Sequence, residues 1–160
     1  MFNKFGLLFV LIISVVIFSP ALNNFFWGDD WFHLQVSQIS NLNEFFNFFS
    51  FQYTSQSTPF YRPISTQLFF FIFNNLFGLN ALPYYFFLLI IFAVSLWLLY
   101  IFIFLITKDK KAALLTTFIY GISATNFPRL YYLSNLQEVL MTVFVLASLI
   151  FFMGMVYKFN

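Results

Sequence analysis

Long apolar segments alternate with short polar ones along this chain of 160 residues. Four segments are apolar enough and long enough to predict membrane-spanning helices, because a helix needs roughly 20 apolar residues to cross the hydrocarbon core of a bilayer. They cover about residues 5–22, 81–106, 112–128 and 139–157. The third is the weakest, since Gly121 and Pro128 interrupt or end it. The pattern predicts an all-α membrane protein with about four transmembrane helices in a single transmembrane region, 1–160.

The segment between the first two predicted spans, 23–80, is expected to form one large loop with interfacial helices. Within it, residues 42–49 carry Phe and Leu at helical spacing among Asn and Glu, which indicates an amphipathic helix lying in the membrane interface. Packing of that helix against the transmembrane helices is an equally good interpretation. Residues 64–77 predict a second embedded or interfacial helix, followed by a turn at Gly78 and Asn80.

Composition supports the membrane assignment. Hydrophobic residues make up 62% of the chain, charged residues 8%, and the mean hydropathy is +0.89. A soluble domain is normally about a quarter charged, so that class is excluded. The absence of Cys excludes a disulfide framework, a catalytic thiol and a thiolate metal site. A net charge of +2 gives no reason to expect a nucleic-acid partner.

The distribution of charge predicts an orientation. Cytoplasmic loops are enriched in Lys and Arg, and the four predicted spans put five basic residues on one side, Lys4, Lys108, Lys110, Lys111 and Lys158. We therefore expect a multi-pass protein of the plasma membrane with a cytoplasmic N-terminus and the loop 23–80 outside. The alternative for the first segment is a cleaved signal peptide, because Lys4 precedes it and small residues flank Pro20.

The segment from Trp27 to His33 is the main candidate for chemistry. Asp29 and Asp30 are adjacent there, and neighbouring carboxylates beside a membrane are costly, since burial and like charge both disfavour ionisation. On a helix their side chains diverge by about 100°, so one can act as a general base while the other holds a partner. The alternative is a structural one, in which an Asp caps the N-terminus of a helix.

His33 follows Asp29 by four residues and Asp30 by three, which places it on their helical face. Asp30, His33 and Glu138 are therefore weak candidates for ligands of a divalent metal, the only cofactor that the residues suggest. A His bonded to a loop carbonyl, or an Asp–His ion pair, explains the same spacing.

Arg62 lies between Tyr61 and Pro63 with no other charge near it in the sequence. A guanidinium binds phosphate through paired N–H groups, and the phosphate available at this depth is that of a lipid. Two other interpretations are equally good: Arg62 reaches bulk headgroups, or it pairs with Asp29 or Asp30.

Taken together, these motifs resemble the N-terminal part of the GT-C-fold glycosyltransferases, and most closely the protein O-mannosyltransferase group with its bacterial relatives. The resemblance runs from about Phe2 to Met155. It rests on five short motifs in the same order relative to the spans: Asp29-Asp30-Trp31-Phe32-His33, Tyr61-Arg62-Pro63, Asn75-Leu76-Phe77-Gly78-Leu79-Asn80, Asn126-Phe127-Pro128 and Tyr132-Leu133-Ser134-Asn135-Leu136-Gln137-Glu138.

The resemblance implies a function and a set of roles. The family transfers a sugar from a polyprenyl-phosphate carrier to an acceptor outside the cytoplasm, with inversion at the anomeric carbon. It implies that Asp29 is the catalytic base and that Asp30 orients the acceptor or a metal. Arg62, with Tyr61 and His33, would bind the donor, and Glu138 would shape the site. The acceptor, whether protein, lipid or glycan, is not implied.

Two further interpretations come from different classes. The chain resembles only part of a family with more spans, so we expect an N-terminal fragment or truncated reading frame of such an enzyme, with doubtful activity by itself. A non-catalytic small membrane protein, such as a component of a transporter or flippase, would use the acids as an ion relay. Relay carboxylates lie within spans near the midplane, whereas all the acids here fall outside the predicted spans. A degenerate remnant without function fits the sequence too.

Overall fold

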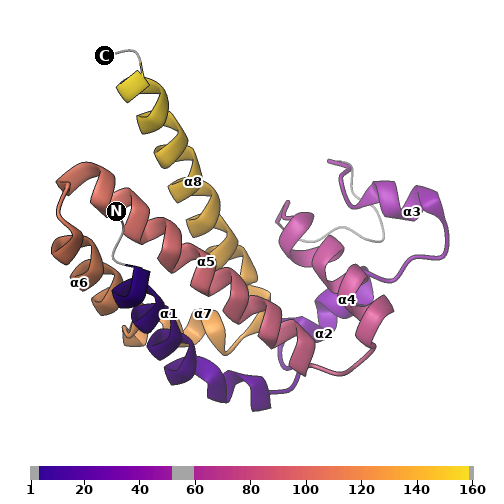
Figure 1. Ribbon diagram of the computed structural model, residues 1–160. Coiled ribbons are helices and arrows are strands. Elements are labelled where there is room, and N and C mark those ends of the chain that lie inside the picture. The colour runs from indigo at the N-terminus through magenta and orange to yellow at the C-terminus, as the bar shows by residue number, and fades with distance from the viewer. Residues whose placement is uncertain (1–3, 52–59, 159–160) are drawn as a thin grey trace.

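The computed structural model describes residues 4–51 and 60–158, and those residues form helices, turns and loops without any strand (Figure 1). Part of the predicted loop, 52–59, lies outside the described residues. The α-helices are α1 (Lys4–Phe18), α2 (Asp29–Val36), α3 (Leu42–Asn47), α4 (Phe69–Phe77), α5 (Leu82–Thr107), α6 (Lys110–Gly121), α7 (Phe127–Leu130) and α8 (Leu136–Lys158). The all-α prediction is confirmed for this part of the chain.

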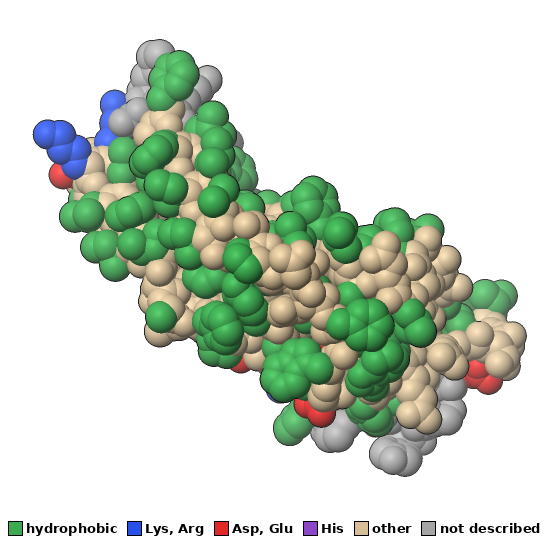
Figure 2. All heavy atoms as spheres, turned by 90° about the horizontal axis from the view of Figure 1, so that it is seen from below, with side chains coloured by type: hydrophobic (Ala, Val, Ile, Leu, Met, Phe, Trp, Pro, Cys, Tyr) green, Lys and Arg blue, Asp and Glu red, His purple; other side chains and the backbone are tan. Residues whose placement is uncertain are grey.

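Three helical segments among the described residues are long and apolar enough to cross a membrane: Phe5–Asn23, Leu82–Thr107 and Leu133–Met155. The first two match the first and second predicted spans to within one residue at each end, and the last begins six residues before the fourth predicted span, 139–157, and ends two residues before its end. Hydrophobic side chains accordingly cover much of the surface in Figure 2, with a cluster of basic side chains at one end. The chain therefore has the character of an integral membrane protein.

The third predicted span, 112–128, is wrong as a continuous helix. α6 has 12 residues, about 18 Å at helical rise, which is too short for a hydrocarbon core of about 30 Å. It ends at Gly121, where a Cβ would collide with the Ser14 hydroxyl of α1. The Asn126 side chain then donates a hydrogen bond of 2.6 Å to the Tyr120 carbonyl, satisfying an acceptor that a continued helix would have used. Short helical pieces complete the path.

This broken segment still brings the chain back along α5, against which α6 packs. Beyond α7, the Tyr131 carbonyl accepts a hydrogen bond of 3.4 Å from the Tyr85 hydroxyl, close to the N-terminal end of α5. The other end of α5 is closed by Lys108 in a left-handed conformation, after which Asp109 caps α6 by accepting from the Lys111 amide. The turn after α7 therefore lies at the end of α5 that adjoins α4.

α3 confirms that a helix forms within 42–49. At its N-terminus the N-cap residue Asn41 accepts from the Glu44 amide at 3.0 Å, and Glu44 accepts from the amide of the preceding residue, Ser40, at 2.6 Å. Phe45 and Phe48 lie with ring centroids 5.7 and 5.9 Å from that of Phe71 in α4. The helix therefore packs against a neighbour through one face.

α5 is the central helix of the bundle. Its buried side chains contact α1, α4 and the segment around Leu133, and the rings of Phe18 and Phe92 meet edge to face at 5.7 Å. A π-helical turn, Ile64–Leu68, leads into α4 and completes the helix predicted over 64–77. α2, α4 and the start of α8 consequently meet beside the N-terminal end of α5 (Figure 1).

Candidate functional site

α2 begins at a position that only glycine fits well. Gly28 has φ +56° and ψ −126°, a conformation that costs an L-residue with a side chain roughly 1–3 kcal/mol. A Cβ there would also approach the Tyr132 hydroxyl to 2.9 Å. That hydroxyl instead accepts a hydrogen bond of 2.7 Å from the Asp29 amide. The turn thus joins the N-terminus of α2 to the segment that precedes α8.

Asp30 makes the second connection between these segments. One carboxylate oxygen accepts hydrogen bonds from the Ser134 amide at 2.8 Å and the Ser134 hydroxyl at 2.6 Å, and the other accepts from the Trp27 amide at 3.2 Å. The residue is fully buried, with 0% exposure. Burial raises the pKa of Asp30, while the hydrogen bonds oppose that shift. Its carboxylate is therefore already bonded within the chain, whereas the sequence predicts that it contacts the acceptor or a metal.

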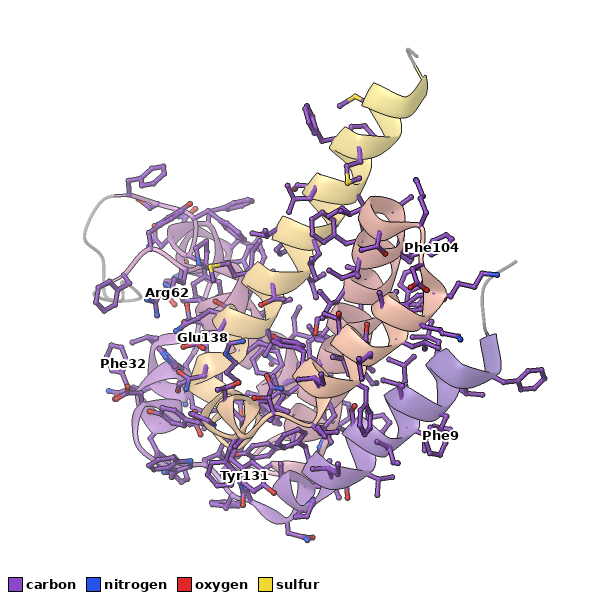
Figure 3. All side chains as sticks on the ribbon, turned by 90° about the vertical axis from the view of Figure 1, so that its left-hand side faces the viewer. Phe9, Phe32, Arg62, Phe104, Tyr131 and Glu138 are labelled. Atoms are coloured by element: carbon purple, nitrogen blue, oxygen red, sulfur yellow. The ribbon has the colours of Figure 1, made fainter. Side chains whose placement is uncertain are left out.

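Asp29, His33 and Arg62 line one cavity of about 200 Å³. The first two lie one helical turn apart on α2, as the spacing predicts, and Arg62 enters from the start of the π-helical turn. Figure 3 shows Phe32 and Arg62 on the same side of the molecule, away from Phe9 and Phe104. The remaining lining residues are Phe32, Phe60, Thr66, Tyr132, Ser134, Asn135 and Gln137. A carboxylate, an imidazole and a guanidinium therefore surround one small space.

His33 is a neutral polar group in this cavity near pH 7. Burial lowers the pKa of His33 below its ordinary value of 6.5; the Asp29 carboxylate opposes the shift and the Arg62 guanidinium adds to it. Its ring lies 5.4 Å from the ring of Phe70. Its buried Nδ1 has no hydrogen-bond partner among the described residues. The imidazole thus has one buried nitrogen that no described residue satisfies.

Arg62 holds its charge without a carboxylate partner. Its guanidinium carbon lies 4.7 Å from the centre of the Phe60 ring, a cation–π arrangement. The single ion pair among the described residues joins Arg129 and Glu138 instead, at 2.9 Å. The interpretation in which Arg62 pairs with Asp29 or Asp30 is therefore wrong, and the guanidinium remains available to an anion.

An apolar groove of about 550 Å³ adjoins the same arginine. One wall is the segment 61–65 with Phe49, and the other is the face of α8 made by Gln137, Leu140, Met141, Phe144 and Val145. Tyr61 lines this groove, and its hydroxyl donates to the Phe49 carbonyl at 3.2 Å. Arg62 and Gln137 line both the groove and the polar cavity. A ligand with a polar head and an apolar tail could therefore occupy both spaces.

Glu138 lies outside the cavity wall. It accepts from Arg129, which also donates to the Tyr120 hydroxyl at 3.0 Å, and it belongs to the first turn of α8. Within the described part of the chain no three His, Asp or Glu side chains gather closely enough to hold a metal ion. The predicted combination of Asp30, His33 and Glu138 is thus wrong, because two of the three are bound elsewhere.

Several cavity residues were not predicted. Thr66, Tyr132, Ser134 and Gln137 line the space without any charge that would single them out in the sequence. Tyr132, Ser134 and Gln137 do lie in the motif Tyr132–Glu138, which is one of the motifs that carry the family resemblance.

No family model matches this chain, and no match was found among the curated proteins or the solved structures.

Proposed function

We propose that the chain forms the donor site of a membrane glycosyltransferase of the GT-C type, which transfers a sugar from a polyprenyl phosphate to an acceptor outside the cytoplasm. The observation that carries the proposal is the shared wall of the two spaces: Arg62 borders both the polar cavity with Asp29 and the apolar groove along α8. A phosphate-linked lipid is the ligand class with matching chemistry at both ends. Ligand pockets of roughly 300–1,000 Å³ are usual, and the two spaces together fall in that range.

Arg62 binds the phosphate in this proposal. The guanidinium forms no ion pair with a carboxylate of the described residues, and Pro63 restricts the backbone beside it. During transfer the bond between the anomeric carbon and the phosphate oxygen breaks, and the phosphate leaves with an added negative charge. A fixed cation lowers the free energy of that charge as it develops. The apolar chain of the carrier lies along Leu140 and Phe144 of α8.

Asp29 is the general base. Its neighbour Asp30 is held by Ser134 and Trp27, and the Asp29 amide is held by Tyr132, so the backbone that carries the Asp29 side chain is fixed from two sides. The carboxylate takes the proton of the acceptor hydroxyl while that oxygen attacks the anomeric carbon from the side opposite the phosphate. The product is inverted at that carbon. Neutral His33 orients polar groups of the bound sugar.

The test is transfer of radiolabelled sugar from hexosyl and pentosyl polyprenyl phosphates in vesicles that contain the full chain. We expect Asp29→Asn to lower transfer at least 100-fold, since general base catalysis contributes typically 10²–10⁴-fold. Glu44→Gln is the matched control, because Glu44 caps α3 outside the cavity, and it should retain activity. A variant Asp29→Asn with normal activity would contradict the base assignment. A wild-type chain that binds the donor and leaves it intact would favour a non-catalytic carrier.

A further inference from the structure

One side chain at the junction of the two spaces has an unsatisfied polar atom. Gln137, in the first turn of α8, lines both the polar cavity and the apolar groove. Its Oε1 is buried and has no hydrogen-bond partner among the described residues. A buried amide oxygen left unpaired costs about 1–3 kcal/mol, and most such atoms in folded proteins have partners. The hydrogen bond that the described residues do not supply to this oxygen can come from a ligand.

A second unpaired atom belongs to another residue that lines the same cavity. The buried Nδ1 of His33 also has no partner in the described part of the chain. A neutral imidazole nitrogen either donates or accepts, and a side-chain amide does one or the other according to its orientation. A hydroxyl satisfies every one of these arrangements, since it donates one hydrogen bond and accepts two. The two unpaired atoms thus match a ligand with several hydroxyls better than a bare phosphate, which only accepts when fully ionised.

We propose that Gln137 is a specificity-determining residue that hydrogen-bonds a hydroxyl of the sugar and so distinguishes the glycosylated carrier from the free polyprenyl phosphate. This inference rests on the proposed function. The product lacks the sugar and its phosphate carries the greater negative charge, so Arg62 and the groove, which contact parts present in both, cannot favour the loaded carrier. A contact made to the sugar alone favours entry of the loaded carrier and release of the spent one.

The experiment measures dissociation constants by microscale thermophoresis on the full chain in lipid nanodiscs. The probes are farnesyl phosphate and its esters with mannose, glucose, galactose and arabinose. At least one ester should bind wild-type protein about tenfold more tightly than farnesyl phosphate, since satisfying a buried orphan atom is worth about a factor of ten. Gln137→Met should abolish that preference, measured as the ratio of the dissociation constants for the ester and for farnesyl phosphate in the same variant. Gln35→Met, the same change at an exposed position of α2, should keep it.

The unfolding temperature distinguishes a role of Gln137 in binding the sugar from a structural role. Since Gln137→Met removes an unpaired buried oxygen, the apo variant should unfold at the wild-type temperature or above, whereas a structural glutamine would lower it. Gln137→Leu serves as a second variant if Gln137→Met does not fold. The inference is overturned if no ester binds more tightly than farnesyl phosphate, or if the preference survives both substitutions. Failure of farnesyl phosphate to bind, or binding unaffected by Arg62→Ala, would instead contradict the proposed function.

Discussion

Asp30 and Ser134, 104 positions apart in the chain, share one carboxylate oxygen that receives both the amide and the hydroxyl of the serine, at 2.8 and 2.6 Å. This pair fastens the N-terminus of α2 to the segment that leads into α8. Asp29 lies on one of the joined segments and Gln137 on the other, so the cavity between them depends on this contact.

Ser134→Ala should destabilise the protein. The substitution removes a buried hydrogen bond to a carboxylate, and such bonds contribute roughly 1.5–3 kcal/mol. We expect the free energy of unfolding in detergent to fall by about 2 kcal/mol, measured from the tryptophan fluorescence during denaturation. Ser148→Ala is the control, since its hydroxyl bonds only the Phe144 carbonyl of its own helix and is exposed. Equal effects of the two substitutions would contradict the importance of the contact.

The stability of the wild type relative to Asp30→Asn should depend on pH. Burial raises the pKa of Asp30 in the folded protein above its ordinary value of 3.8, so the unfolded chain ionises first as the pH rises. Over the window between 3.8 and the raised pKa, the folded state binds more protons and its stability falls. Above that window the loss is complete and constant.

Asp30→Asn does not ionise at this position, so the difference in unfolding free energy, wild type minus variant, should be largest below pH 3.8 and decrease as the pH rises. Denaturation of both proteins at a series of pH values measures it. A difference that stays constant or increases with pH would show that burial does not control this carboxyl group.

Substitutions at Gly28 and Gly78 separate the effect of backbone strain from the effect of a steric contact with Tyr132. Both have positive φ, +56° and +57°, but a Cβ at Gly28 meets the Tyr132 hydroxyl, whereas nothing lies within 4 Å of one at Gly78. Both substitutions to Ala should destabilise the protein by roughly 1–3 kcal/mol through backbone strain. Gly28→Ala should cost more, and adding Tyr132→Phe should recover part of the excess. If Gly28→Ala destabilises the protein no more than Gly78→Ala, the Tyr132 side chain moves away from the added Cβ without a cost in free energy.

The orientation is testable because the chain has no cysteine. Trp31→Cys places a thiol on the exposed side of α2, and Lys110→Cys places one at the opposite end of α5. In intact cells a membrane-impermeant thiol reagent should label the first variant, and the second only after permeabilisation. The reverse pattern would put Asp29 on the cytoplasmic side, where an extracytoplasmic acceptor is absent.

Much of the fold follows from local pattern. Apolar length predicts Phe5–Asn23, α5 and α8, and Gly78 with Asn80 predicts the break before α5, because these signals need no knowledge of distant contacts. Gly121 is a local signal too, and α6 ends there as the sequence indicates. The path of the chain beyond Gly121 could not be predicted in the same way. Its apolar composition suits a span, and the close approach of Ser14 to Gly121 depends on the packing of α1 against α6.

In the candidate site, too, the features set by neighbouring residues in the sequence could be predicted, and those set by distant contacts could not. Asp29 and His33 share a helical turn, so their spacing predicts their proximity. For Arg62 the sequence leaves an ion pair with Asp29 or Asp30 open, and only the structure shows that this pair does not form. The burial of Asp30 depends on Ser134, a partner far away in the chain, and Glu138 is bound by Arg129 across a turn whose shape the sequence does not reveal. The place of uncharged residues such as Gln137 in the site can be recognised only from the residues around them in the structure.

Photo-crosslinking of a diazirine-bearing farnesyl phosphate, read out by mass spectrometry, tests the central claim most directly. A lipid whose phosphate lies at Arg62 should attach its chain mainly to Leu140, Met141, Phe144 and Val145, and Arg62→Ala should remove these products. Crosslinks spread evenly over the exposed apolar residues of α1 and α5, such as Phe9 and Trp97, and unchanged by Arg62→Ala, would contradict it.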